Sequence, residues 1–346
     1  MHRFGDYELQ RRVGVGGLAE IWLATRRGPQ GFAREVALKR ILESHAGDKD
    51  FVRSFLEEAR LLARFSHPNV VQVHEVGQVG ETWYLAMEYV RGADLRTVLH
   101  RFERQNRFPP LAFTLNVVAD LCAALEHVHQ ARDEKGRPLH LVHRDVSPHN
   151  LLLSTAGEVK LTDFGIAKAA DQKHRTRTGV IKGKVAYMAP EQVRGDALGP
   201  ATDIFQAGIV FYECLTLAHP FLREATAETF ARIMQGKTMR PRKRRPEIPQ
   251  IVEDGVRDAM RPRPEDRYPS ASVMRLACER ILASLELPRG PGPVKAQMDL
   301  LFPELHPKAP PMKVVVGTAE TGEVTGPTSD QRARRRRPPP IPKHVH

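Results

Sequence analysis

The sequence has little cysteine and, as we interpret it, no apolar run long enough to span a membrane. Only three cysteines occur in 346 residues, with no close pairing, at Cys122, Cys214 and Cys278. This scatter argues against a disulfide framework or a zinc cluster, and predicts that each thiol is a core residue in a reducing compartment. Met1-His2-Arg3 leads almost directly into patterned sequence. We therefore expect neither a signal peptide nor a membrane anchor, and a cytoplasmic location.

Acidic residues are fewer than basic ones, with 41 Asp and Glu against 53 Lys and Arg, which gives a net charge of +12. This excess weakly favours acidic protein substrates. The most basic run, residues 332–337, lacks the interleaved aromatic residues of many nucleic-acid-binding segments. This lack argues against nucleic acid as a partner and is typical of a solvated tail.

Regular patterning fades from about residue 286, where proline becomes dense. We expect residues 286–346 to form a Pro/Arg-rich tail that is largely disordered in isolation. The exception is residues 294–305, in which apolar residues recur at helical spacing, at Met298, Leu301, Phe302 and Leu305. This segment suits a short helix that docks on the rest of the chain or on a partner. A chance apolar cluster is an equally open interpretation.

Three polar side chains occupy two predicted loops. Asp145 and Asn150 belong to His-Arg-Asp-Val-Ser-Pro-His-Asn, residues 143–150, and Asp163 opens Asp-Phe-Gly. Phosphoryl transfer from a nucleotide needs a carboxylate that orients the attacking hydroxyl and accepts its proton. It also needs an amide and a second carboxylate that hold magnesium. Each residue alone is typical of a solvated turn, but the ordered set resembles the corresponding loops of protein kinases.

The resemblance continues near the N-terminus. Residues 13–21 are similar to the glycine-rich loop of kinases, with Gly14 and Gly16 at the first two glycine positions and Ala19 at the third. Glycines let the backbone approach phosphates without Cβ collisions, so Ala19 weakens the match. Farther on, Val-Ala-Leu-Lys reads as a strand, and the resemblance implies that its Lys39 binds the α- and β-phosphates.

An acidic partner for Lys39 is expected on the next helix. Residues 50–65 carry apolar residues at helical spacing, and Pro68 forbids continuation. In similar kinases the paired glutamate lies nine residues before a His-Pro pair, which selects Glu58 here. Glu57 is the second choice, and is better explained as a solvent-facing charge.

The resemblance also implies a nucleotide pocket. Residues 84–90 are similar to the strand that enters the hinge between two lobes, with Met87 as gatekeeper and the backbone of Glu88 to Val90 bonding the adenine edge. The implied nucleotide-binding positions are Val13, Gly14, Gly16, Ala19, Ile21, Ala37, Lys39, Met87, Glu88, Val90, Asn150, Leu152 and Asp163.

The family implied is the bacterial eukaryotic-like (Hanks-type) Ser/Thr protein kinases, over residues 7–285. The implied fold is α+β and two-lobed, with a small antiparallel sheet and one main helix, followed by a larger, mainly helical lobe. ATP with Mg²⁺ is the implied cofactor pair, Mn²⁺ being an alternative ion. The implied partners are protein substrates whose identity the sequence does not give.

Two departures from the family pattern fall at the site of chemistry. The position two after Asp145 is usually a lysine that contacts the γ-phosphate, and here it is Ser147. The position after Gly183 is usually a threonine, and here it is Lys184. We interpret this as an exchange that keeps one ammonium and one hydroxyl in the site. The alternative is that Lys184 points to solvent and Ser147 merely tolerates a lower rate.

Regulation is also implied by the resemblance. Arg144 directly precedes Asp145, and Thr176 and Thr178 occupy the positions that are phosphorylated in similar bacterial kinases. A phosphate there can pair with the arginine and order the loop.

Three function classes follow from the sequence. The first is an active Ser/Thr kinase regulated by autophosphorylation. The second is a nucleotide-binding pseudokinase, favoured by Ser147 and Ala19. The third is a nucleic-acid- or membrane-associated protein driven by the basic tail.

Overall fold

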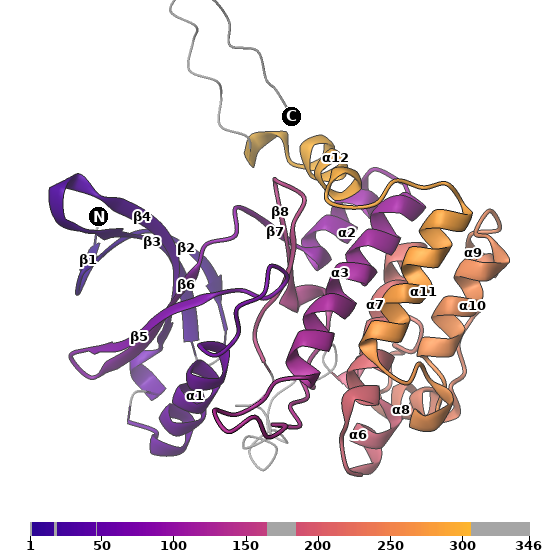
Figure 1. Ribbon diagram of the computed structural model, residues 1–346, viewed down its shortest axis with the longest axis horizontal. Helices are drawn as coiled ribbons and strands as arrows, with labels where there is room; N and C mark the ends of the chain where they lie inside the picture. Colours follow the sequence, from indigo (N-terminus) through magenta and orange to yellow (C-terminus); the bar gives the residue numbers. More distant parts are fainter. Residues whose placement is uncertain (1, 17–18, 46, 165–184, 306–346) are drawn as a thin grey trace, which may run out of the picture. The chain divides into compact units, whose positions relative to one another are not determined.

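The computed structural model describes residues 2–16, 19–45, 47–164 and 185–305. These residues form two lobes, a β-sheet lobe with one helix and a mainly helical lobe (Figure 1). The predicted α+β, two-lobed fold is confirmed. Lys184, Thr176 and Thr178 lie outside the described residues, as does the tail beyond residue 305.

The first lobe is built on a six-stranded antiparallel sheet in the order β1-β2-β3-β4-β6-β5. Its strands are β1 His2–Phe4, β2 Tyr7–Val15, β3 Ala19–Arg27, β4 Ala33–Ile41, β5 Val73–Val79 and β6 Thr82–Glu88. Helix α1, Lys49–Leu62, begins at Asp48, whose carboxylate accepts from the N–H groups of Asp50 and Phe51. Its buried side carries Phe55, Glu58 and Leu62, so the apolar periodicity places Glu58 toward the lobe interface.

The second lobe opens with a small three-stranded sheet, β7 Gly92–Asp94, β8 Leu151–Ser154 and β9 Val159–Leu161. Its helices are α2 Leu95–Arg104, α3 Leu111–His129, α6 Pro190–Arg194, α7 Pro200–Thr216, α8 Thr226–Gln235, α9 Pro241–Arg244, α10 Gln250–Ala259, α11 Ala271–Ser284 and α12 Gly292–Leu301.

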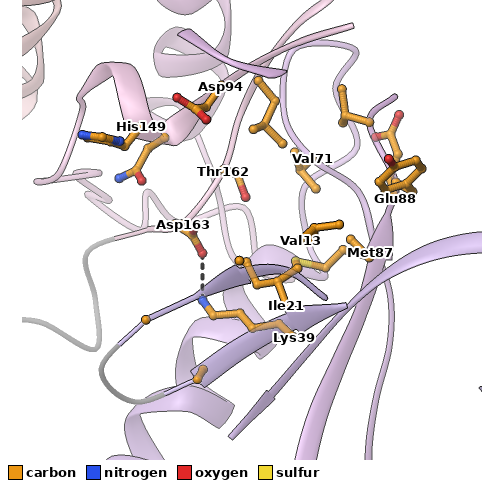
Figure 2. Close-up of a pocket in the computed structure, with 18 of the residues that line it drawn as sticks. Val13, Ile21, Lys39, Val71, Met87, Glu88, Asp94, His149, Thr162 and Asp163 are labelled. Carbon is orange, nitrogen blue, oxygen red and sulfur yellow. Dashed lines mark hydrogen bonds and ion pairs between the residues drawn. The ribbon is translucent and has the colours of Figure 1, made fainter. Parts of the chain in front are cut away.

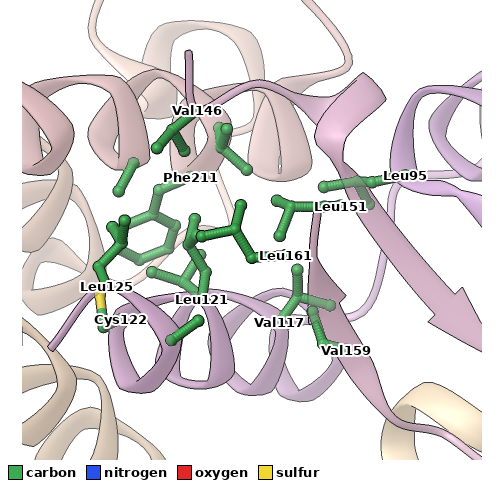
Figure 3. Packing of buried hydrophobic residues seen from close by; sticks show 14 of the residues in the cluster. Leu95, Val117, Leu121, Cys122, Leu125, Val146, Leu151, Val159, Leu161 and Phe211 are labelled. Atoms are coloured by element: carbon green, nitrogen blue, oxygen red, sulfur yellow. The ribbon is translucent and has the colours of Figure 1, made fainter. Parts of the chain in front are cut away.

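Helices α3 and α7 form the centre of the hydrophobic core. Figure 3 shows Leu121 of α3 near Phe211 of α7 and Leu161 of β9, and Val117 of α3 near Val159 of β9, all of them buried. Helix α3 is long and apolar enough to span a membrane by length and composition, so our expectation that no segment has this character is wrong. Since 72% of that apolar stretch is buried inside the unit, packing accounts for its composition.

The compact unit is longer at both ends than residues 7–285. Within the described residues it extends from residue 2 to residue 305, because β1 pairs with β2 and α12 packs on the second lobe. The segment for which we expected a docking helix, residues 294–305, thus overlaps α12, which lies on the kinase-like unit itself.

Candidate active site

A cleft of about 700 Å³ lies between the lobes. The β2–β3 hairpin, β4, the end of β6 and β8 all contribute side chains to it (Figure 2). Its walls include all thirteen residues for which the sequence predicted nucleotide contact: Val13, Gly14, Gly16, Ala19, Ile21, Ala37, Lys39, Met87, Glu88, Val90, Asn150, Leu152 and Asp163. Five strand and loop segments that are distant in sequence therefore meet around one space.

Lys39 pairs with two carboxylates at the back of the cleft. Its Nζ lies 2.7 Å from Asp163 Oδ1 and 3.3 Å from Glu58 Oε1 (Figure 2 marks the pair with Asp163). Burial opposes the charge on Lys39, but Asp163 and Glu58 more than offset it and raise the pKa of this ammonium. Glu57 is exposed and Glu58 is buried, so Glu58 is the acid of α1 that reaches the lysine.

The loop that carries Asp145 is held from below by Asp203 on α7. The fully buried carboxylate of Asp203 accepts from the backbone N–H groups of His143 and Arg144, both at 2.8 Å. His129 Nε2 lies 2.8 Å from the same carboxylate. Arg144 has a φ of 69°, a conformation that L-residues seldom adopt. These bonds hold the strained turn that projects Asp145.

Two glutamines complete this support. Gln206 on α7 accepts from the Val146 N–H at 3.0 Å and donates to the Arg144 carbonyl at 3.1 Å. Gln192 on α6 donates to the same carbonyl at 3.0 Å. The backbone on both sides of Asp145 is thereby fixed from α6 and α7.

Asp145 and Asn150 are directly bonded to each other. Asn150 Nδ2 donates to the Asp145 backbone oxygen at 2.7 Å and to its Oδ2 at 2.8 Å. Both bonds use the side-chain nitrogen of Asn150, so its side-chain oxygen, Oδ1, is the atom that could bind a cation. Oxygen donors are what Mg²⁺ prefers, and it takes few protein ligands when phosphates supply the rest. Asn150 and Asp163 therefore fit a phosphate-bound magnesium. The described residues contain no group of three or more His, Cys, Asp or Glu that would hold a metal on their own.

Phe164 fixes the position of Asp163. Its ring lies 5.3 Å from that of Phe65 and 4.6 Å from the imidazole of His143, centroid to centroid. Phe164 is only 2% exposed, and Asp163 itself has a positive φ of 56°. The packing of the Phe164 ring against Phe65 and His143 thus compensates for the backbone strain at Asp163.

A second pocket, of about 540 Å³, adjoins the cleft at the loop of residues 143–150, which we call the catalytic loop. It is lined by Arg96, Glu103, Asp145, Ser147, His149, Asn150, Tyr187, Glu213, Leu217, His219 and Leu222. At its floor, Tyr187 donates to Glu213 at 2.6 Å, and Arg96 lies 3.9 Å from the same carboxylate. Burial raises the pKa of Glu213 to about 7, because these two partners only partly offset the lost hydration.

Glu191 of α6 forms a buried ion pair with Arg267. Two guanidinium nitrogens of Arg267 donate to the two carboxylate oxygens of Glu191 at 2.8 and 2.9 Å, with both side chains buried. Burial opposes the charge on Glu191, but Arg267 lowers its pKa below the usual value. This pair anchors α6, and with it Gln192, to the second lobe.

Several residues of the site were missed by our sequence analysis. Asp94 and Thr162 line the cleft, His149 lines both pockets, and Gln192 and Gln206 support the loop. Asp94 also caps α2 by accepting from the Thr97 N–H at 2.8 Å. The sequence signal for Asp94 was its place before a helical pattern, whereas the two glutamines gave no local signal.

Residues 7–277 match the family model described as "Protein kinase domain", and the chain belongs to that family. Within it, the chain is a bacterial eukaryotic-like (Hanks-type) kinase by its relatives. It is 44% identical over 280 residues to the Tyrosine-protein kinase MasK of Myxococcus xanthus, covering 81% of this chain and 43% of that protein. It is 34% identical to the Serine/threonine-protein kinases PrkC of Bacillus subtilis and PknA of Mycobacterium tuberculosis, covering 78% and 82% of this chain.

The chain covers 39% of PrkC and 63% of PknA, so it spans only part of these relatives. Among solved structures, the PknI kinase domain of Mycobacterium tuberculosis is similar, with a TM-score of 0.59 and 25% identity. That match covers 81% of this chain and 97% of the PknI chain.

Proposed function

We propose that this chain transfers the γ-phosphoryl group of Mg-ATP to serine and threonine hydroxyls of proteins. The observation that carries the proposal is that the two pockets share a wall. His149 and Asn150 line both of them, and Asp145, bonded to Asn150, lines the second. A nucleotide in the first pocket and a hydroxyl in the second would meet at Asp145.

Each side chain has a distinct part in this reaction. Lys39 binds the α- and β-phosphates, and Glu58 keeps the ammonium in place. Asp145 orients the acceptor hydroxyl and takes its proton as the oxygen attacks phosphorus. Asn150 and Asp163 would hold the magnesium ion, which neutralises charge on the phosphates.

The type of acceptor is supported by the relatives and by the catalytic loop. PrkC and PknA are named as Ser/Thr kinases, and Ser147 to His149 lacks the Ala and Arg pattern that is usual in tyrosine kinases. The name of MasK supports a second candidate, in which tyrosine is the acceptor.

Three synthetic peptides that differ only in a central Ser, Thr or Tyr distinguish the two candidates. With Mg-ATP labelled at the γ-phosphate, we expect the Ser and Thr peptides to be phosphorylated at least about tenfold faster than the Tyr peptide, a difference of about 1.4 kcal/mol in barrier. A faster rate with the Tyr peptide would establish the second candidate and overturn the first.

We also propose that autophosphorylation at Thr176 or Thr178 activates the kinase. Support comes from Arg144, whose side chain is exposed and has no ion pair within the described residues. A phosphate that reaches Arg144 would form charge-assisted bonds next to Asp145 and order the segment that bears it.

A further inference from the structure

Helix α12 lies beyond the part of the chain that matches the family. The match ends at residue 277, and α12 begins at Gly292. Val294 and Met298 of this helix are fully buried. The helix contacts α2, α3 and β8, and Figure 1 shows it above α2 and α3 at the edge of the second lobe. The apolar side of α12 is therefore integrated into the core.

Arg101 of α2 binds the end of this segment through three different contacts. Its guanidinium donates to the carbonyl oxygen of Leu301 and pairs with Glu304. Its Cζ lies 3.9 Å from the centroid of the Phe302 ring, which is only 2% exposed. A carbonyl, a carboxylate and an aromatic face together define one position for the guanidinium.

The beginning of the segment is anchored separately. Asn116 of α3, which is 5% exposed, donates to the Pro288 carbonyl at 3.0 Å and accepts from the Gly290 N–H at 2.8 Å. The β8–β9 turn touches it as well: a Cβ on Gly157 would lie 2.2 Å from the Pro291 carbonyl oxygen. Residues 288–305 are thus attached to three elements of the lobe, and we call them the C-terminal brace.

Two of the elements that the brace contacts carry walls of the pockets. Helix α2 supplies Arg96 and Glu103 to the second pocket, and its cap Asp94 lines the nucleotide cleft. Strand β8 supplies Leu152 to the cleft. By contrast, Lys39 lies on β4 and Asp145 on the loop before β8, whereas the main contacts of α12 are with α2, α3 and β8.

We propose that the C-terminal brace holds α2 in the position that binding at both pockets requires, with Arg101 as the positioning residue. The inference rests on the proposed kinase function, which assigns the pockets to nucleotide and acceptor. A displaced α2 alters the walls that bind these ligands, whereas Lys39 is held by Glu58 and Asp163 and the loop of Asp145 is held by α7. Loss of the brace contact therefore raises KM more than it lowers kcat.

The test compares Arg101→Ala with Arg104→Ala in the full chain. Arg104 is an exposed arginine on the same helix that has no side-chain bond within the described residues, so it controls for the loss of a surface cation. We expect Arg101→Ala to raise KM for ATP and for the acceptor peptide about three- to tenfold, as losing about 1 kcal/mol of contact implies. We expect kcat to stay within about twofold of wild type.

Hydrogen exchange of the α2 amides gives a readout that does not need turnover. We expect residues 95–104 to exchange faster in Arg101→Ala and at the wild-type rate in Arg104→Ala. MgADP affinity, measured by calorimetry, should fall in the same variant. Because both measurements are independent of phosphoryl transfer, a failure of the brace can be distinguished from a failure of the proposed function.

A second variant, Glu304→Gln, removes only the ion pair of the same cluster and should change the same quantities in the same direction by a smaller factor. It also covers the case in which Arg101→Ala does not fold. Unchanged exchange in α2, or unchanged KM and MgADP affinity despite faster exchange, would overturn the proposal. A lower kcat at constant KM would overturn it too.

Discussion

Lys39 Nζ lies 2.7 Å from Asp163 Oδ1, closer than it lies to its helical partner Glu58. The proposed phosphate-binding cation and the proposed magnesium ligand are thus paired with each other. A magnesium ion would be held by Asp163, and the phosphates of a bound nucleotide would be held by Lys39. Glu58 is then the one described protein carboxylate that continues to hold the lysine, so the geometry of α1 controls whether the site is competent.

Glu58→Gln should therefore reduce kcat/KM for ATP about 10- to 100-fold, because a charge-assisted bond of about 1.5–3 kcal/mol is lost. Glu57→Gln is the matched control, since Glu57 is the exposed neighbour on the same helix. Steady-state kinetics of the two variants measure the difference. Equal effects of the two substitutions would contradict the assignment of Glu58.

Exchanging Ser147 and Lys184 tests whether they compensate for each other. Ser147 is 8% exposed and lines the second pocket beside Asp145. Lys184→Thr should lower kcat, since a cation aimed at the transferring phosphoryl group contributes a few kcal/mol. Ser147→Lys should also lower kcat, since it places two like charges in a site that suits one. The double mutant should be more active than the two single effects predict, by a coupling of at least about 1 kcal/mol. Additive effects would end this interpretation.

Thr176→Ala/Thr178→Ala should lose most activity toward an added peptide and keep its affinity for MgADP. The physical reason is that no phosphate can then pair with Arg144. Intact-mass measurement of wild type after incubation with Mg-ATP should show added phosphate, which phosphopeptide mapping should place at these threonines. A fully active double mutant, or wild type without phosphate, would count against the switch.

Glu213 predicts a pH dependence of stability. Its pKa is raised to about 7 from an ordinary value of 4.5, so the folded state holds the proton more tightly than the unfolded state between these values. The free energy of unfolding of wild type should therefore fall as pH rises from about 4.5 to 7, by up to about 3 kcal/mol from this group. Glu213→Gln removes the titrating group.

Urea unfolding at pH 5 and pH 8 measures this effect. Relative to wild type, Glu213→Gln should be more stable at pH 8 than it is at pH 5. Glu103→Gln, which alters an exposed acid of the same pocket, should show no such trend. A constant difference between Glu213→Gln and wild type at the two pH values would show that burial does not perturb this carboxyl.

Much of the site was accessible to sequence analysis because its residues lie in short, ordered motifs. Asp145, Asn150 and Asp163 stand within 19 consecutive residues, and the spacing from the His-Pro pair that the resemblance implies separated Glu58 from Glu57. The two-lobed fold followed from the resemblance that these motifs carry. The ordered spacing of the polar side chains was the decisive signal.

The supporting contacts could not be predicted, since they join residues that are far apart. Gln206 reaches the Arg144 carbonyl across 62 positions, and Arg101 reaches Glu304 across 203. A glutamine in an apolar helix and an arginine on a surface helix have no local pattern that reveals such partners. The apolar composition of α3 was visible in the sequence, whereas its burial against α7 and α11 was not.

The central claim is that Asp145 serves phosphoryl transfer while Lys39, Asn150 and Asp163 serve the bound nucleotide. The most direct measurement compares wild type with Asp145→Asn for transfer of the labelled γ-phosphate to the Ser peptide and for MgADP affinity. We predict that turnover falls about 10²- to 10⁴-fold, because the proton acceptor is lost. MgADP affinity should stay within about twofold of wild type. Phosphorylation by Asp145→Asn at the wild-type rate, or no transfer by wild type, would contradict the account.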